Sequence, residues 1–194
     1  MHIPFLDALD ERPLVCDGAM GTMLYARGIF LNRSFDELNL TQPDLVAEVH
    51  QAYVRAGADV IETNTFGANR VKLAAFGLVS EMAAINTQGA RIARRAAREE
   101  AYVAGAIGPL GIRVEPWGKT GLDEAEAWFR EQAEALCEGW TCQYVIADRA
   151  CDTAAFLQRI AERVLKKPAK AGIMAGHEQK TISQRCDGRG VGAA

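Results

Sequence analysis

Three short apolar stretches recur along the chain, and each runs into glycine- or threonine-rich residues. They are LVCD at 14–17, DVIE at 59–62 and YVAGAIG at 102–108. Stretches of this length, rich in β-branched residues and bounded by turn-forming residues, are typical of buried strands followed by loops. The pattern therefore predicts three strands that begin near residues 14, 59 and 102.

Longer segments with helical periodicity lie between and after these stretches. Residues 41–57 predict a helix with Thr41 as N-cap, Pro43 in the first turn and Gly57 as the C-terminal stop. Residues 80–100 place apolar residues on one side and four arginines on the other, and residues 122–139 begin with an acidic turn. Both are predicted to be amphipathic helices.

The alternation of strands and helices predicts an α/β fold built from right-handed β-α-β units around a parallel sheet. The same interval predicts a fourth strand at 143–147. About four such units would form the N-terminal part of a (β/α)8 TIM barrel, which usually needs about 250 residues. The sequence thus predicts an incomplete barrel, whose open sheet edges would favour pairing with a second copy of the chain.

Composition fits one globular core, because 49% of the 194 residues are hydrophobic and 24% are charged. No apolar run approaches the roughly 18 residues of a membrane span, and the N-terminus does not resemble a signal peptide. The expectation is a cytoplasmic protein that does not bind membranes. An odd number of irregularly spaced cysteines fits reduced thiols and not a disulfide framework. They are Cys16, Cys137, Cys142, Cys151 and Cys186.

Charge is uneven along the chain. Residues 166–194 contain six basic and two acidic residues, so this tail carries +4 and the remainder −7 of the net −3. Its low hydrophobicity predicts a disordered tail. It lacks interleaved aromatic residues and any nucleic-acid-binding module, so no nucleic-acid partner is expected.

Short polar residues crowd the ends of the first two predicted strands. Ligands of parallel α/β folds bind at the carboxyl ends of the strands. In DGAMGT, Asp17 could face an ammonium group while the backbone N–H groups near Gly18 face a carboxylate, which suggests an amino-acid substrate. The candidate substrate-binding residues are Asp17, Gly18, Ala19, Gly21, Glu62, Thr63, Asn64 and Thr65. For ETNTFGAN, a helix start capped by Asn69 or Thr65 remains an alternative that is compatible with binding.

The blocks DGAMGT, LNLTQPDLVAEVHQAYVRAGADVIETNTFGAN and GAIGPLG closely resemble, in this order, the homocysteine S-methyltransferase family, in particular the homocysteine-binding domain of cobalamin-dependent methionine synthase. The resemblance runs from about residue 14 to about residue 139. It implies a (β/α)8 barrel in which a zinc-bound homocysteine thiolate attacks a methyl donor. By the same resemblance, the donor is methylcobalamin, methyltetrahydrofolate or S-methylmethionine, and the candidate residues would hold homocysteine.

Departures from the family begin after Gly139. The apolar strand with its acidic pair and the three zinc-binding cysteines, two of them adjacent, are not found in the sequence. Three segments are therefore expected: a partial homocysteine-binding barrel (1–139), a βα segment unlike the family (140–165) and the basic tail (166–194). The expectation is a truncated or frame-shifted member that lacks the zinc ligands and is inactive alone. The alternative is a non-catalytic partial barrel that binds a partner or self-associates.

Several isolated residues have simpler structural explanations. The cysteines at 137, 142 and 151 lack the paired spacing of a closed zinc site, and none of the three histidines has a partner at ligand spacing, so no metal ligand is assigned. Cys16 and His50 are interpreted as core residues, and the arginines at 91–98 as a solvated helix face.

Overall fold

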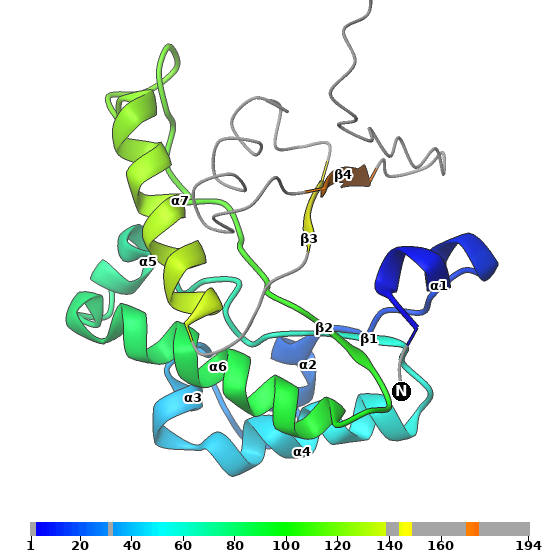
Figure 1. Cartoon of the computed structure of the whole chain (residues 1–194). Helices are drawn as coiled ribbons and strands as arrows, with labels where there is room; N and C mark the ends of the chain where they lie inside the picture. Colours follow the sequence, from blue (N-terminus) through cyan, green and yellow to red (C-terminus); the bar gives the residue numbers. More distant parts are fainter. Residues whose placement is uncertain (1–2, 31–32, 139–143, 149–169, 175–194) are drawn as a thin grey trace, which may run out of the picture. The chain divides into compact units, whose positions relative to one another are not determined.

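The computed structural model describes residues 3–30, 33–138, 144–148 and 170–174. The chain divides into two compact units, residues 1–138 and 139–194 (Figure 1). The helices of the first unit are α1 (Phe5–Glu11), α2 (Met20–Tyr25), α3 (Leu38–Thr41), α4 (Pro43–Arg55), α5 (Arg70–Ala74), the 3₁₀ helix η1 (Val79–Glu81), α6 (Met82–Ala97) and α7 (Leu122–Cys137).

A small parallel arrangement of extended segments lies at the centre of the first unit. Strand β1 (Val60–Glu62) pairs in parallel with β2 (Tyr102–Ala104). On the other side of β1, the backbone of residues 15–17 makes one parallel bridge, between Cys16 and Val60. The order is therefore 15–17, β1, β2, which is what successive right-handed β-α-β units produce.

Two of the predicted strands are shorter in the structure than in the sequence pattern. LVCD forms a single bridge in place of a strand, because only the backbone groups of Val15 and Asp17 bond to the Asp59–Val60 backbone. The strand predicted over 102–108 ends at Ala104. It ends there because the N–H group of Ala106 bonds to a threonine side chain and that of Gly108 to a loop carbonyl, not to a strand.

The predicted helices exist, with different starts. Pro43 begins α4 and Gly57, with a φ of +96°, follows its end, as predicted. Thr41 does not cap this helix; it belongs to α3, and its hydroxyl bonds to the carbonyl of Glu37. The segment predicted to open at Ser80 begins with η1 and continues as α6. The pattern gave no indication of α1, α2 or α3, and it offered a helix at α5 only as the alternative interpretation of ETNTFGAN.

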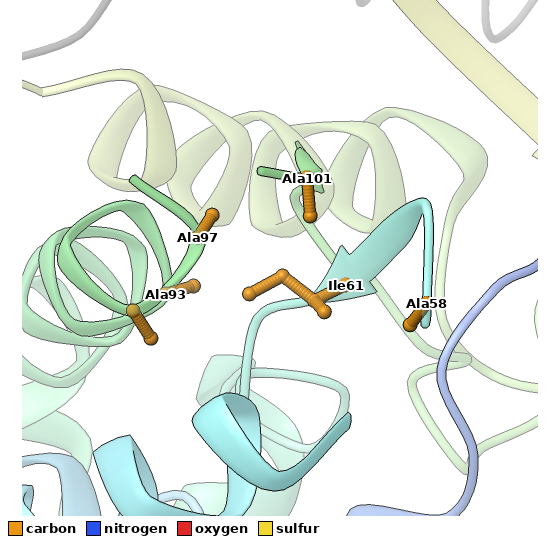
Figure 2. Packing of buried hydrophobic residues seen from close by; sticks show 6 residues of the cluster. Ala58, Ile61, Ala93, Ala97 and Ala101 are labelled. Atoms are coloured by element: carbon orange, nitrogen blue, oxygen red, sulfur yellow. The ribbon is translucent and has the colours of Figure 1, made fainter. Parts of the chain in front are cut away.

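A core of small residues joins the strands to the helices. Ile61 of β1 is fully buried and points toward Ala93 and Ala97 of α6, with Ala58 and Ala101 beside it (Figure 2). Alanines at these positions let α6 lie close to the sheet, and burying a side chain such as Ile61 contributes about 1.5–3 kcal/mol. A second cluster packs α2, α3, α4 and α6 together. Its buried members are Leu24, Leu38, Val46, Val49 and Ile92.

Helix α1 is tied to the amino ends of the strands. The hydroxyl of Tyr102 donates to the carbonyl oxygen of Ile3 at 2.7 Å, and its ring contacts Phe5 edge to face. Arg12 forms a bidentate ion pair with Asp59. These contacts anchor the end of the sheet opposite to the one where the candidate residues lie.

The described residues of the second unit form one parallel pair. Strand β3 (Tyr144–Asp148) pairs with β4 (Lys170–Met174). The strand predicted at 143–147 is thus present, one residue later. Strand β4 lies within the stretch for which the sequence predicts disorder, and the rest of that stretch is outside the described residues. Within the described parts the strands form two separate pairs, so the partial (β/α)8 barrel stays a prediction. No described helix is long and apolar enough to cross a membrane.

Candidate functional site

Two acidic residues meet where the first extended segment and β1 end. Both carboxylate oxygens of Asp17 accept from the backbone N–H of Glu62, at 3.2 and 3.1 Å. The Glu62 side chain is exposed. Asp17 therefore fixes the end of its own segment against the end of β1 and places two carboxylates side by side at this edge.

Burial changes the chemistry of Asp17. It raises the pKa of the carboxyl to about 6, and the neighbouring charge of Glu62 adds to the rise, while the Glu62 N–H group opposes it. A carboxyl with this pKa is ionised at neutral pH, but the ionised form lacks a cationic partner among the described residues. The geometry suits a positively charged ligand group.

The DGAMGT turn leads from Asp17 into α2. Ala19 is the N-cap of α2 and provides no side-chain cap, so the N–H groups of the first turn, from Met20 to Thr22, have no intrahelical acceptor. Gly18 and Ala19 are exposed, and Gly21 is half-buried near Phe35. Backbone donors without an acceptor among the described residues thus lie a few residues from the Asp17 carboxylate.

The threonines after β1 point into the protein and form a closed ring of hydrogen bonds. The Thr65 hydroxyl donates to the carbonyl oxygen of Ala106 at 2.8 Å, and the Ala106 N–H donates to the Thr63 hydroxyl at 2.9 Å. The Thr63 and Thr65 hydroxyls lie 2.6 Å apart. Because Thr65 has used its only hydrogen, Thr63 must be the donor to Thr65. Neither hydroxyl has a hydrogen left for a ligand.

Asn64 is buried as well and pairs with an asparagine that the sequence analysis did not identify. Its Nδ2 donates to the Oδ1 of Asn39 at 3.1 Å and to the carbonyl of Phe35 at 2.8 Å. Asn39 in turn donates to the carbonyls of Asn64 and Ile85. A polar residue within the apolar LNLT segment was the signal that could have identified Asn39. This pair fastens the loop after β1 to α3 and α6.

Two further side chains hold the same loop from other directions. Gln132 of α7, fully buried, donates to the carbonyl of Thr65 at 2.7 Å. The Asp36 carboxylate accepts from the N–H of Gly67 at 2.9 Å, and burial raises its pKa. In the sequence, nothing distinguishes Gln132 from the solvated acidic residues around it, so only the structure could find it.

Helix α5 starts as the alternative interpretation of ETNTFGAN predicts. The side chain of Asn69 accepts from the N–H of Lys72 at 2.9 Å and caps α5. Thr65 is not a cap, since its hydroxyl is committed to Ala106. Of the eight candidate residues, the structure leaves Asp17, Gly18, Ala19, Gly21 and Glu62 at least partly accessible, and it encloses the side chains of the other three.

Comparison with known proteins decides the family. The sequence profile of the homocysteine S-methyltransferase family matches residues 14–179, most of the chain. The chain belongs to this family. The match continues past Gly139, where the sequence analysis expected the resemblance to end, and it includes residues 140–165. The division of the chain at residues 139 and 165 otherwise stays a prediction.

Individual relatives agree with this assignment. Methionine synthase of Mycobacterium tuberculosis is 36% identical over 146 residues, and that of Mycobacterium leprae is 34% identical; each alignment covers 69% of this chain. The chain spans only 12% of the length of either enzyme. In its metallated and oxidized forms, the homocysteine methyltransferase MmuM from Escherichia coli superposes with TM-scores of 0.65 and 0.68 at 26% identity. These alignments cover 85% and 89% of this chain, and 64% and 65% of MmuM.

A zinc site, which members of this family are expected to hold, would need several ligand side chains close together. The described residues contain no group of three histidine, cysteine, aspartate or glutamate side chains placed to hold an ion. Cys137 ends α7. Cys16 lies beside β1 and is an exposed free thiol, so its interpretation as a core residue is wrong. The remaining three cysteines lie outside the described residues. The described part thus offers no fit for a catalytic zinc.

His50 is a core residue, as predicted, but an unusual one. It is fully buried on α4, and neither ring nitrogen has a hydrogen-bond partner in the described structure. Burial lowers the pKa of its imidazole to about 4, so the ring is neutral at physiological pH. His50 makes no hydrogen bond to Asp17 or Glu62 in the described structure.

Proposed function

We propose that this chain binds homocysteine at the Asp17 edge of its sheet and serves as the amino-acid-binding part of a homocysteine S-methyltransferase. The observation that carries the proposal is the half-buried carboxylate of Asp17, which lies at a strand end. Among the described residues it has no cationic partner, and the backbone N–H groups that start α2 follow within a few residues. Family membership supplies the substrate class.

Each part of the edge has a counterpart in an amino acid. Asp17 would pair with the substrate ammonium group, and the exposed Glu62 carboxylate would add negative charge beside it. The N–H groups at the start of α2 would face the substrate carboxylate. Thr63, Asn64 and Thr65 contribute by shaping the loop, because their polar groups are already bonded inside the protein.

In the reaction, these residues would bind and orient homocysteine so that its thiol faces outward from the strand ends. A zinc ion, where a family member holds one, supplies a thiolate at neutral pH. By family resemblance the methyl donor would be methylcobalamin, methyltetrahydrofolate or S-methylmethionine. Nothing in the described residues selects among these three.

Calorimetric titration of homocysteine into wild type and Asp17→Asn tests the proposal. The asparagine can still accept from the Glu62 N–H group, so the fold should persist while the charge is lost. The expected loss of binding free energy is about 1.5–3 kcal/mol, the range for a charge-assisted hydrogen bond. Asp10→Asn, on the exposed face of α1, is the matched control and should bind like wild type. Equal affinities of wild type and Asp17→Asn would contradict the proposal and favour a non-catalytic partial barrel.

Affinity should also depend on pH. The Asp17 pKa of about 6 exceeds the ordinary value of 3.8, so protonation competes with ammonium binding below pH 6. Affinity should therefore rise roughly tenfold between pH 5 and pH 7, and this rise should vanish in Asp17→Asn. The folding stability of the ligand-free protein should change with pH in the opposite direction. The raised pKa of Asp17 stabilises the fold below about pH 4, and this contribution is lost as the pH rises through 6.

A further inference from the structure

We propose that Tyr53 of α4 is a positioning residue that sets the location of the DGAMGT turn. The Tyr53 hydroxyl donates to the carbonyl oxygen of Ala19 at 3.3 Å. Ala19 is the N-cap of α2, so this hydrogen bond holds the residue from which the free N–H groups of α2 follow. In the sequence Tyr53 is only one of the apolar positions of its helix.

The ring of Tyr53 lies directly against the backbone of Gly18. A Cβ atom added at Gly18 would lie 3.0 Å from the Tyr53 hydroxyl oxygen and 3.2 Å from its Cε1. Both distances are shorter than ordinary van der Waals contact. Position 18 therefore favours glycine because the Tyr53 ring leaves too little room for a Cβ atom. Backbone conformation is not the reason, since Gly18 is not among the residues with positive φ.

Tyr53 itself is held by the core. It packs against both buried clusters, the one around Ile61 and the one around Val46 and Val49. Its ring is thus fixed by the packing of α4 against the sheet and α2, which lie close to it in Figure 1. Tyr53 thus links the packing of α4 to the position of the turn relative to the Asp17 carboxylate. The consequence for ligand affinity rests on the proposed function, whereas the consequence for the turn does not.

Tyr53→Phe removes only the hydroxyl and tests the inference in the full chain. We expect hydrogen–deuterium exchange of a peptide covering residues 14–25 to accelerate at least threefold, and the Kd for homocysteine to rise about three- to tenfold. Tyr102→Phe is the matched control, because it also removes a hydroxyl bonded to a backbone carbonyl, at the other end of the strands. It should change neither exchange in 14–25 nor the Kd.

A second pair of variants tests the contact with Gly18. Gly18→Ala should weaken homocysteine binding and accelerate exchange in 14–25. In the double variant with Tyr53→Phe, the fold-changes in Kd and exchange rate should be smaller than the product of those of the single variants, because the closest clash of the new Cβ atom involves the Tyr53 hydroxyl. Unchanged exchange in Tyr53→Phe, or effects of the two substitutions that simply multiply, would overturn the positioning role. If wild type fails to bind homocysteine, the proposed function fails, and the exchange measurements still decide the role of Tyr53.

Discussion

The hydroxyl of Thr65 closes a ring of hydrogen bonds that connects the residues just beyond the paired ends of β1 and β2. The ring satisfies both the N–H and the carbonyl of one peptide residue, Ala106, with two threonine side chains. Thr65 is fully buried, and its carbonyl also accepts from Gln132. Hydrogen bonds in such closed networks polarise one another, and removing one member leaves the others unpaired.

Thr65→Val therefore tests the ring with almost no change of side-chain volume. It removes the donor to the Ala106 carbonyl and the acceptor for the Thr63 hydroxyl, leaving two buried polar groups unsatisfied. The expected loss in free energy of unfolding is about 1–3 kcal/mol for each such group, measured by urea denaturation. Thr41→Val is the control: it also removes a hydroxyl bonded to a carbonyl, but at an exposed position where water can replace the bond, so it should stay within about 0.5 kcal/mol of wild type. A Thr65→Val protein as stable as wild type would show that the ring contributes nothing.

At the scale of the element, α6 ends on a residue with unfavourable backbone geometry. Arg98, its C-cap, has φ of 49° and ψ of −122°, a region that glycine adopts without strain and other residues rarely enter. The chain must take this turn because α6 is followed within a few residues by the buried Ala101 and by β2. Tight connection of helix to strand thus imposes the strain.

The same substitution at two positions of this exposed arginine face should have opposite effects. Arg98→Gly should raise the free energy of unfolding by about 0.5–2 kcal/mol, because glycine relieves the strain. Arg91→Gly, inside α6, should lower it by about 1 kcal/mol, the cost of glycine in a helix interior. Thermal or urea unfolding of the two variants measures both effects. Destabilisation by Arg98→Gly would mean that the arginine side chain makes contacts worth more than the strain.

At the scale of the whole molecule, the sequence predicts that the isolated 194-residue protein binds no stoichiometric zinc. Its cysteine spacing does not match a zinc site, and family chemistry requires a metal-bound thiolate. We therefore expect no formation of methionine from homocysteine with methylcobalamin, methyltetrahydrofolate or S-methylmethionine, even with zinc added. Elemental analysis of the purified protein, followed by a methionine assay with each donor, is the test. One zinc per chain together with turnover would show that cysteines assigned here to other roles are ligands.

Removing metal with a chelator separates metal binding from amino-acid binding. If the Asp17 edge works as proposed, the Kd for homocysteine should stay unchanged within twofold after treatment with a chelator. The Asp17→Asn protein provides the reference for lost binding in the same assay. A Kd that weakens more than tenfold on chelation would place a metal in the binding site and contradict the cysteine assignment.

Sequence periodicity alone determined the βα rhythm of the first unit, because buried strands and amphipathic helices leave patterns that local physics enforces. The positions of α4 and α6, the stop at Gly57 and the cap at Asn69 follow from residues close to them in the chain. The sequence alone also identified Asp17 and Glu62 as candidate residues, since a polar residue directly after a buried strand marks the strand end.

Only the tertiary structure decided which polar side chains face outward and which hold the loops together. Thr63 and Thr65 look like ligand contacts in the sequence, but their partner is Ala106, about forty residues away. Gln132 and Tyr53 lie in ordinary helical patterns, and their roles appear only when α7 and α4 pack against the turns that they contact. Hydrogen bonds between distant segments depend on how the core brings those segments together, and local sequence patterns do not predict that arrangement.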